Sequence, residues 1–109
     1  MIEAIVGSAS SEKVLIFLLA REQGYAREIA RFFDSDLAPL QNQLIKLEDA
    51  GVLVSQTAGR TRMFSFNPRY ALIDELQALL EKALQFYPED LRDRLLKNRR
   101  RPRRGGKPL

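Results

Sequence analysis

The sequence predicts a mainly α-helical fold with a small β-hairpin. Over residues 26–50, apolar residues recur at spacings of three and four, which is the period of a helix with one buried face. After Gly51 the period changes to two, and β-branched and aromatic residues dominate, which is typical of strands. The helical stretch is interrupted by Asp34-Ser35-Asp36, whose side chains favour turns and helix N-termini. We therefore expect two short helices followed directly by a hairpin.

The second of these helices, 36–50, is followed without a spacer by the hairpin. Leu40, Leu44 and Leu47 form a stripe typical of a core, and Gly51 supplies the left-handed residue that often ends a helix. The hairpin is expected over 52–66, with its tip at Ala58-Gly59-Arg60. Helix, turn, helix and hairpin in this order predict a winged helix-turn-helix, whose second helix can enter the major groove of DNA.

The junction between helix and hairpin carries a more specific signal. Residues 44–53 have the form L-x-x-L-E-x-A-G-V-L. Together with Arg27-Glu28-Ile29-Ala30 and Phe64-Ser65-Phe66-Asn67-Pro68, this junction resembles the ArsR-like branch of the bacterial winged-helix regulators, across residues 2–87. The resemblance implies a dimeric transcriptional regulator. Metal-sensing members of that family hold their ion through Cys or His, and this chain departs from that pattern because it has neither.

Two further helices are expected on either side of this block. One begins near Ser10 and carries a nearly continuous apolar run, so it should be covered on most sides. Residues 2–6 before it form an apolar strand or a turn of helix, on the core or on a dimer surface. The other helix spans 70–87 and has an apolar stripe too broad for one contact. We expect a homodimer through this helix, with simple core packing as the alternative; its seam comprises Leu72, Leu76, Leu79, Ala83 and Phe86.

The chain is divided into a winged-helix domain over 1–87, a short amphipathic helix over 88–98 and a basic tail over 99–109. The total net charge is +4, but residues 1–91 carry −4 and residues 92–109 carry +8. The tail has nothing to bury and is expected to be disordered. A basic arm of this kind is attracted to any phosphate backbone, and the alternative is a solvated tail that contacts nothing in particular.

The absence of Cys and His excludes several kinds of function. Disulfides, thiolate metal sites and imidazole bases are impossible, so we expect no enzyme, no cofactor and no soft-metal site, although carboxylates could still hold a hard cation. The longest apolar run, residues 14–20, is too short to cross a membrane. Because Met1-Ile2-Glu3 is not a basic signal-peptide start, the expected compartment is the cytoplasm.

The exposed face of the second helix supplies the candidate DNA contacts. Amide side chains pair with adenine, whereas guanine favours Arg or Lys, and small apolar groups meet thymine methyls. The expected base contacts are Ala38, Pro39, Gln41 and Asn42, and the expected phosphate contacts are Arg27, Arg31, Lys46, Arg60 and Arg62. Asp34 and Asp36 oppose phosphate binding at the helix N-terminus, although Asp36 could serve as its cap. The alternative for Gln41 and Asn42 is an ordinary solvated helix face.

Two functions follow from these patterns. The first is a sequence-specific transcriptional regulator that binds double-stranded DNA as a homodimer. The second is a non-enzymatic winged-helix module that docks onto another protein, while the tail contacts nucleic acid without sequence preference. No residue identifies a small-molecule effector.

Overall fold

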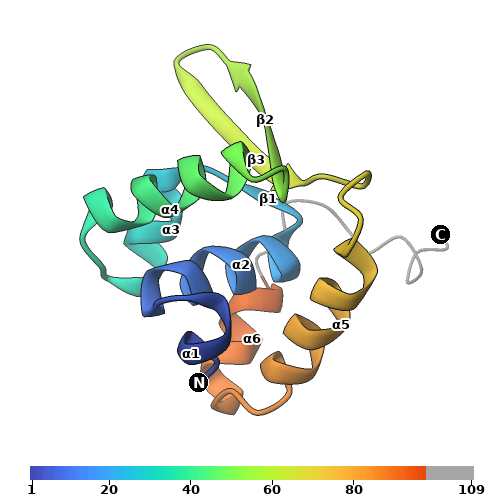
Figure 1. Ribbon diagram of the computed structural model, residues 1–109. Helices are drawn as coiled ribbons and strands as arrows, with labels where there is room; N and C mark the ends of the chain where they lie inside the picture. The colour runs from blue at the N-terminus through green and yellow to red at the C-terminus, as the bar shows by residue number, and fades with distance from the viewer. Residues whose placement is uncertain (98–109) are drawn as a thin grey trace, which may run out of the picture.

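The computed structural model describes residues 1–97 and has the mainly helical architecture, with one small sheet, that the sequence predicts (Figure 1). The predicted basic tail, 99–109, lies outside the described residues. The elements in chain order are α1 (Glu3–Val6), α2 (Ala9–Arg21), β1 (Gln23–Gly24), α3 (Ala26–Phe33), α4 (Leu37–Asp49), β2 (Leu53–Ala58), β3 (Thr61–Phe66), α5 (Ile73–Leu84) and α6 (Glu89–Lys97).

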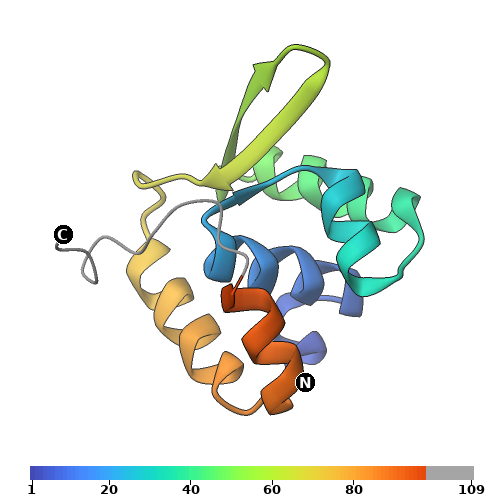
Figure 2. The same ribbon diagram turned by 180° about the vertical axis from the view of Figure 1, so that it is seen from behind.

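Helix α2 lies at the centre of the molecule, between the α3–α4 layer and the α5–α6 layer (Figures 1 and 2). Its apolar run is buried on nearly all sides, and Val14, Ile16, Phe17 and Leu18 have no exposed surface. The helix begins at Ala9, slightly earlier than expected, because the Ser8 hydroxyl accepts a hydrogen bond of 3.0 Å from the Ser11 amide. The expectation of a central, covered helix is confirmed.

The sheet has three antiparallel strands in the order β1-β3-β2. Strands β2 and β3 pair from Leu53↔Phe66 to Ala58↔Thr61, so only two residues form the turn. Gly59 has a φ of 65° there, which favours glycine. This hairpin, the wing, projects away from the helices (Figure 1). Strand β1, of only two residues, is not among the elements that the sequence predicts.

Gly24 lets β1 pass close to the core. A Cβ atom at this position would lie 2.7 Å from Cε1 of Phe17, which is closer than packed atoms approach. Its backbone pairs with Phe64 on β3, so β1 joins the base of the wing to the end of α2. Only glycine fits this strand beside an aromatic ring without a shift of one or the other.

The two C-terminal helices, α5 and α6, are shorter than the expected 70–87 and 88–98. Helix α5 begins only at Ile73, because the chain from Asn67 to Leu72 is folded into turns; the Asn67 side chain holds the first of them by donating to the Gly51 carbonyl at 2.9 Å. Helix α6 folds back onto α2 and buries Leu95 completely. None of the helices within residues 1–97 has both the length and the apolar character needed to cross a membrane.

Arg21 anchors the end of α6. Its Nε donates to the Leu95 carbonyl at 3.0 Å and its Nη2 to the Arg94 carbonyl at 3.1 Å. These carbonyls belong to the last turn of α6, where a cation also complements the helix dipole. The guanidinium lies over the rings of Phe17 and Phe32, at 4.9 and 5.1 Å from their centroids. A buried arginine at the end of α2 therefore joins α6 to α3.

Glu12 is a second buried charged residue on α2. One oxygen of its carboxylate accepts from the Ile2 amide at 2.9 Å, and the other accepts from the Tyr87 hydroxyl. Burial, followed by this hydrogen bond, raises the pKa of Tyr87 above its usual value. The segment before α1 and the connection between α5 and α6 are thus both attached to the start of α2.

Candidate nucleic-acid interface

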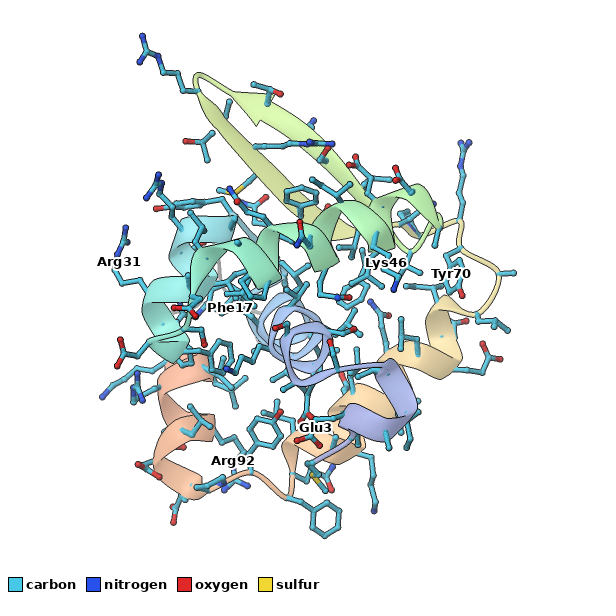
Figure 3. All side chains as sticks on the ribbon, turned by 60° about the vertical axis from the view of Figure 1, so that its left-hand side comes forward. Glu3, Phe17, Arg31, Lys46, Tyr70 and Arg92 are labelled. Atoms are coloured by element: carbon cyan, nitrogen blue, oxygen red, sulfur yellow. The ribbon has the colours of Figure 1, made fainter. Side chains whose placement is uncertain are left out.

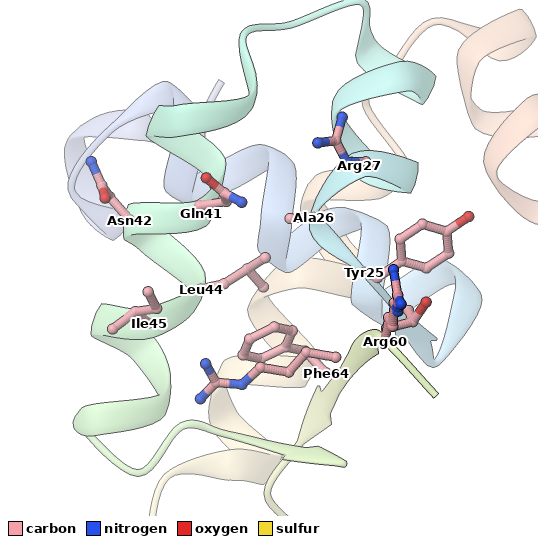
Figure 4. Close-up of a pocket in the computed structure, with 11 residues that line it drawn as sticks. Tyr25, Ala26, Arg27, Gln41, Asn42, Leu44, Ile45, Arg60 and Phe64 are labelled. Carbon is pink, nitrogen blue, oxygen red and sulfur yellow. The ribbon is translucent and has the colours of Figure 1, made fainter. Parts of the chain in front are cut away.

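A groove of about 460 Å³ lies between the start of α3, the exposed face of α4 and the wing (Figure 4). Helix α4 packs on α2 and α3 through Leu40 and Leu44, which are buried, so its opposite face is turned outward. The groove residues are Tyr25, Ala26 and Arg27 beside α3, Gln41, Asn42, Leu44 and Ile45 on α4, and Arg60, Thr61, Arg62 and Phe64 on the wing.

The structure brings two of the four expected base contacts into this groove. Gln41 and Asn42 are exposed on α4 and line it (Figure 4). Ala38 and Pro39 are also exposed but lie in the first turn of α4, outside the groove lining. Ile45 is 46% exposed and lines the groove one helical turn after Gln41. Ile45 is not among the base contacts expected from the sequence.

The expected phosphate contacts divide into two groups. Arg27 and Arg60 are exposed at the groove, whereas Arg31 and Lys46 are exposed outside it, at opposite ends of the α3–α4 layer (Figure 3). With the other described residues, the side chains of these four form no hydrogen bond or ion pair. They remain available to an anionic partner.

Arg62 differs from these four cations. Its Nη2 donates to Oε1 of Glu48 near the end of α4, and its Nε donates to the Ser55 hydroxyl at 3.1 Å. The sequence predicted that Arg60 and Arg62 would act alike. In the structure their surroundings differ. Glu48 neutralises Arg62 across the gap between helix and wing, a pairing that no local spacing could reveal, whereas Arg60 has no such partner among the described residues.

The turn between α3 and α4 contains the two acidic residues that the sequence marked as unfavourable for phosphate. Asp34 ends α3 in the left-handed conformation, with a φ of 53°, and the Ser35 amide donates to the Ala30 carbonyl at 2.9 Å. Asp36 precedes the first residue of α4, but its side chain accepts no capping hydrogen bond. The expected capping role of Asp36 is therefore not observed, and its exposed carboxylate stays near the helix N-terminus.

The expected dimer seam on α5 is split by the fold. Ala83 is buried in the core together with its neighbours Leu80 and Leu84, because this side of α5 packs on α2. That part of the seam cannot face a partner without unpacking the core. Leu76 packs against the same core and Leu79 is partly exposed, whereas Leu72 is 56% and Phe86 65% exposed at the two ends of the helix.

No group of three or more acidic side chains within residues 1–97 is placed to hold a metal ion. The fold and the groove are those of a winged-helix protein. Helices α2, α3 and α4 form its three-helix core, α4 has one exposed face, and the wing lies beside that face.

Comparison with solved structures supports this class. ZitR of Lactococcus lactis, a double mutant in apo form, matches with a TM-score of 0.54 and 19% identity, over 82% of this chain and 76% of that one. The adhesin competence repressor AdcR of Streptococcus pyogenes matches with a TM-score of 0.54 and 11% identity, over 88% and 80%. Wild-type ZitR matches with a TM-score of 0.50 and 15% identity, over 89% and 73%.

No protein-family model and no curated protein matches the sequence. At the identities of the structural matches, the likeness is one of fold, and it confirms the predicted winged helix. The ArsR-like branch within that fold is not confirmed by it.

Proposed function

We propose that this protein is a DNA-binding transcriptional regulator that acts as a homodimer, with α4 in the major groove. The observation that carries the proposal is the groove between α4 and the wing, which is lined by two amide side chains and by two free arginines, Arg27 and Arg60. The similarity in fold to a protein named as a repressor supports the same function.

The chemistry of the α4 face favours A/T-containing sites. Gln41 and Asn42 each have the donor and acceptor needed to pair with adenine at N6 and N7. Ile45 offers an apolar contact to a thymine methyl beside them. Among the exposed α4 residues no Arg or Lys precedes Lys46, so the usual guanine contact is absent from the first two turns. Base preference is therefore assigned to Gln41, Asn42 and Ile45.

The exposed cations supply affinity rather than preference. Arg27 and Arg60, which line the groove, are the proposed phosphate contacts nearest the bases, and Arg31 and Lys46 are exposed cations outside the groove. A protein of this kind binds two half-sites related by a dyad, about 34–36 Å apart, which requires a second copy of the chain. Exposed apolar side chains on α1 and just outside the two ends of α5, namely Ile5, Leu72 and Phe86, are the surface proposed to meet that copy.

Selection of bound sequences from random duplex DNA tests this function. The full chain should enrich a dyad-symmetric, A/T-containing site, and a chain lacking residues 99–109 should enrich the same site with a weaker dependence on salt. Gln41→Ala and Asn42→Ala should each flatten the preference at particular base pairs, by roughly 1–3 kcal/mol. Arg27→Gln should weaken binding to all sequences alike. A wild-type chain that enriches no sequence would refute the proposal.

The alternative function is a protein-interaction module. It is favoured by the acidic balance of residues 1–91, net −4, and by the neutralisation of Arg62, both of which reduce attraction to DNA. Its expected signature is duplex binding that depends only on residues 99–109 and shows no sequence preference. Full retention of preference in the Gln41 and Asn42 variants would also point to it.

A further inference from the structure

Three side chains join the end of α4 to one face of the wing. Glu48, near the end of α4, accepts from the Ser55 hydroxyl on β2 at 2.6 Å through one oxygen and from Arg62 on β3 through the other. Arg62 in turn donates to the same hydroxyl at 3.1 Å, which closes a ring of three hydrogen bonds. We call Glu48, Ser55 and Arg62 the wing clamp.

The register of the sheet explains how these residues meet. Ser55 pairs with Phe64 and Thr57 with Arg62, so the four side chains share the face of the wing that is turned toward α4. The Arg62 guanidinium lies 5.2 Å from the centre of the Phe64 ring, and Phe64 is buried. The arginine is therefore held by a carboxylate, a hydroxyl and an aromatic face at once, which suits its planar, multivalent head group.

The chain between α4 and the wing is short, so the Glu48–Arg62 contact lies close to the point where the wing leaves α4. Only Ala50, Gly51 and Val52 separate α4 from β2. The Glu48 and Arg62 side chains are 24% and 51% exposed, and an ion pair at that exposure adds little to overall stability. It does, however, connect the wing to α4 at a second place, besides the covalent connection.

We propose that Arg62 is a positioning residue, which the wing clamp holds against α4 while DNA is bound, and that it makes no phosphate contact. This inference rests on the proposed function. It assigns different roles to two arginines of the same hairpin: Arg60, at the tip and without a partner among the described residues, contacts phosphate, whereas Arg62 keeps Arg60 in register with Gln41 and Asn42.

The salt dependence of DNA binding separates the two roles. Arg60→Gln, the matched control, should lower the slope of log affinity against log salt by about 0.9, the value of one lost phosphate contact. Arg62→Gln should leave the slope unchanged, because the long Arg60 side chain still reaches a phosphate from a wing that is no longer held at one angle. It should reduce the preference for the selected site, because the wing is no longer in register with Gln41 and Asn42. Glu48→Gln should reduce the preference in the same way, and the double variant should be no worse than either single one, because both act on one contact.

A slope that falls as much in Arg62→Gln as in Arg60→Gln would overturn the proposal. So would additive losses of preference in the two clamp variants. Both variants alter exposed or partly exposed side chains outside the core, and thermal unfolding verifies their folded state before binding is measured.

A measurement without DNA distinguishes failure of this inference from failure of the proposed function. Because the chain has no Cys, spin labels can be attached specifically at Ala38→Cys on α4 and Ala58→Cys at the end of β2, both exposed. The distribution of distances between the labels should broaden in Glu48→Gln and Arg62→Gln but not in Arg60→Gln. Unchanged distributions would overturn the clamp, even if the protein binds DNA; broadened ones support it, even if no sequence is selected.

Discussion

Single residues fix the positions of several elements in this fold, and Gly24 is the clearest case. Gly24→Ala should destabilise the protein by about 1–3 kcal/mol, the usual cost of overpacking a core, because the new methyl group would meet the Phe17 ring. Chemical denaturation measures the change in the free energy of unfolding. In the double variant with Phe17→Leu, the cost of Gly24→Ala should shrink, because the ring that it meets is gone. Strictly additive effects would contradict this explanation.

The contact between Tyr87 and Glu12 makes a second prediction at the residue scale. Tyr87→Phe should cost about 1–3 kcal/mol, because it leaves one oxygen of a buried carboxylate without its donor. Tyr70→Phe is the control, since the Tyr70 hydroxyl makes no hydrogen bond with the other described residues. Equal unfolding free energies for the two variants would show that the contact does not matter for stability.

The raised pKa of Tyr87 sets the pH range over which its hydroxyl stabilises the folded protein. The contribution of the neutral hydroxyl is fully present below the ordinary tyrosine pKa of 10.0 and is lost only as pH rises through the higher pKa of the folded state. The difference in stability between wild type and Tyr87→Phe should therefore stay constant up to that ordinary value. Phenolate absorbance, compared between the two proteins, should show the Tyr87 component only at higher pH.

At the scale of elements, the periodicity of the sequence predicted helices and strands formed by neighbouring residues. It did not predict contacts between elements that are distant in the sequence. The leucine spacing of α4 and the change of period after Gly51 predicted α3, α4 and the wing, because each depends on residues close in sequence. Strand β1 has two residues and exists only through pairing with β3, about forty residues later. The Glu48–Arg62 contact and the burial of Ala83 likewise depend on packing between elements, which no spacing within one element encodes.

Helix α6 provides the test at this scale. Although the sequence placed it outside the domain of residues 1–87, its Leu95 is fully buried against α2. Leu95→Ala should therefore destabilise the whole molecule by about 2–5 kcal/mol, as for other buried leucines. Leu91→Ala, on the same helix but only partly buried, is the control and should cost clearly less. A small effect of Leu95→Ala on global unfolding would mean that α6 is an appendage.

The fold of the whole molecule restricts where the proposed second copy can dock. The core uses the Leu80–Leu84 side of α5, so the proposed dimer must rely on the exposed residues at the ends of this helix. Leu72→Glu with Phe86→Glu should give a folded monomer by sedimentation, because neither residue belongs to the core. A matched pair of changes at exposed polar positions of α5, Glu75→Gln and Gln85→Glu, should leave the dimer intact. A wild type that stays monomeric at high micromolar concentration would contradict the homodimer.

The pairing of β1 divides the wing into two parts with different dynamics. Phe64 and Ser65 on β3 have a strand on both sides, whereas Thr61, Arg62 and Met63 are paired only with β2. Backbone amides near the base should therefore exchange with solvent only through large openings, whereas those toward the tip should exchange through local fraying. A single strand of six residues would thus contain both the most and the least protected amides of the sheet. Beyond the wing clamp, the tip can bend to follow the curvature of a bound surface, while the base stays fixed to the core.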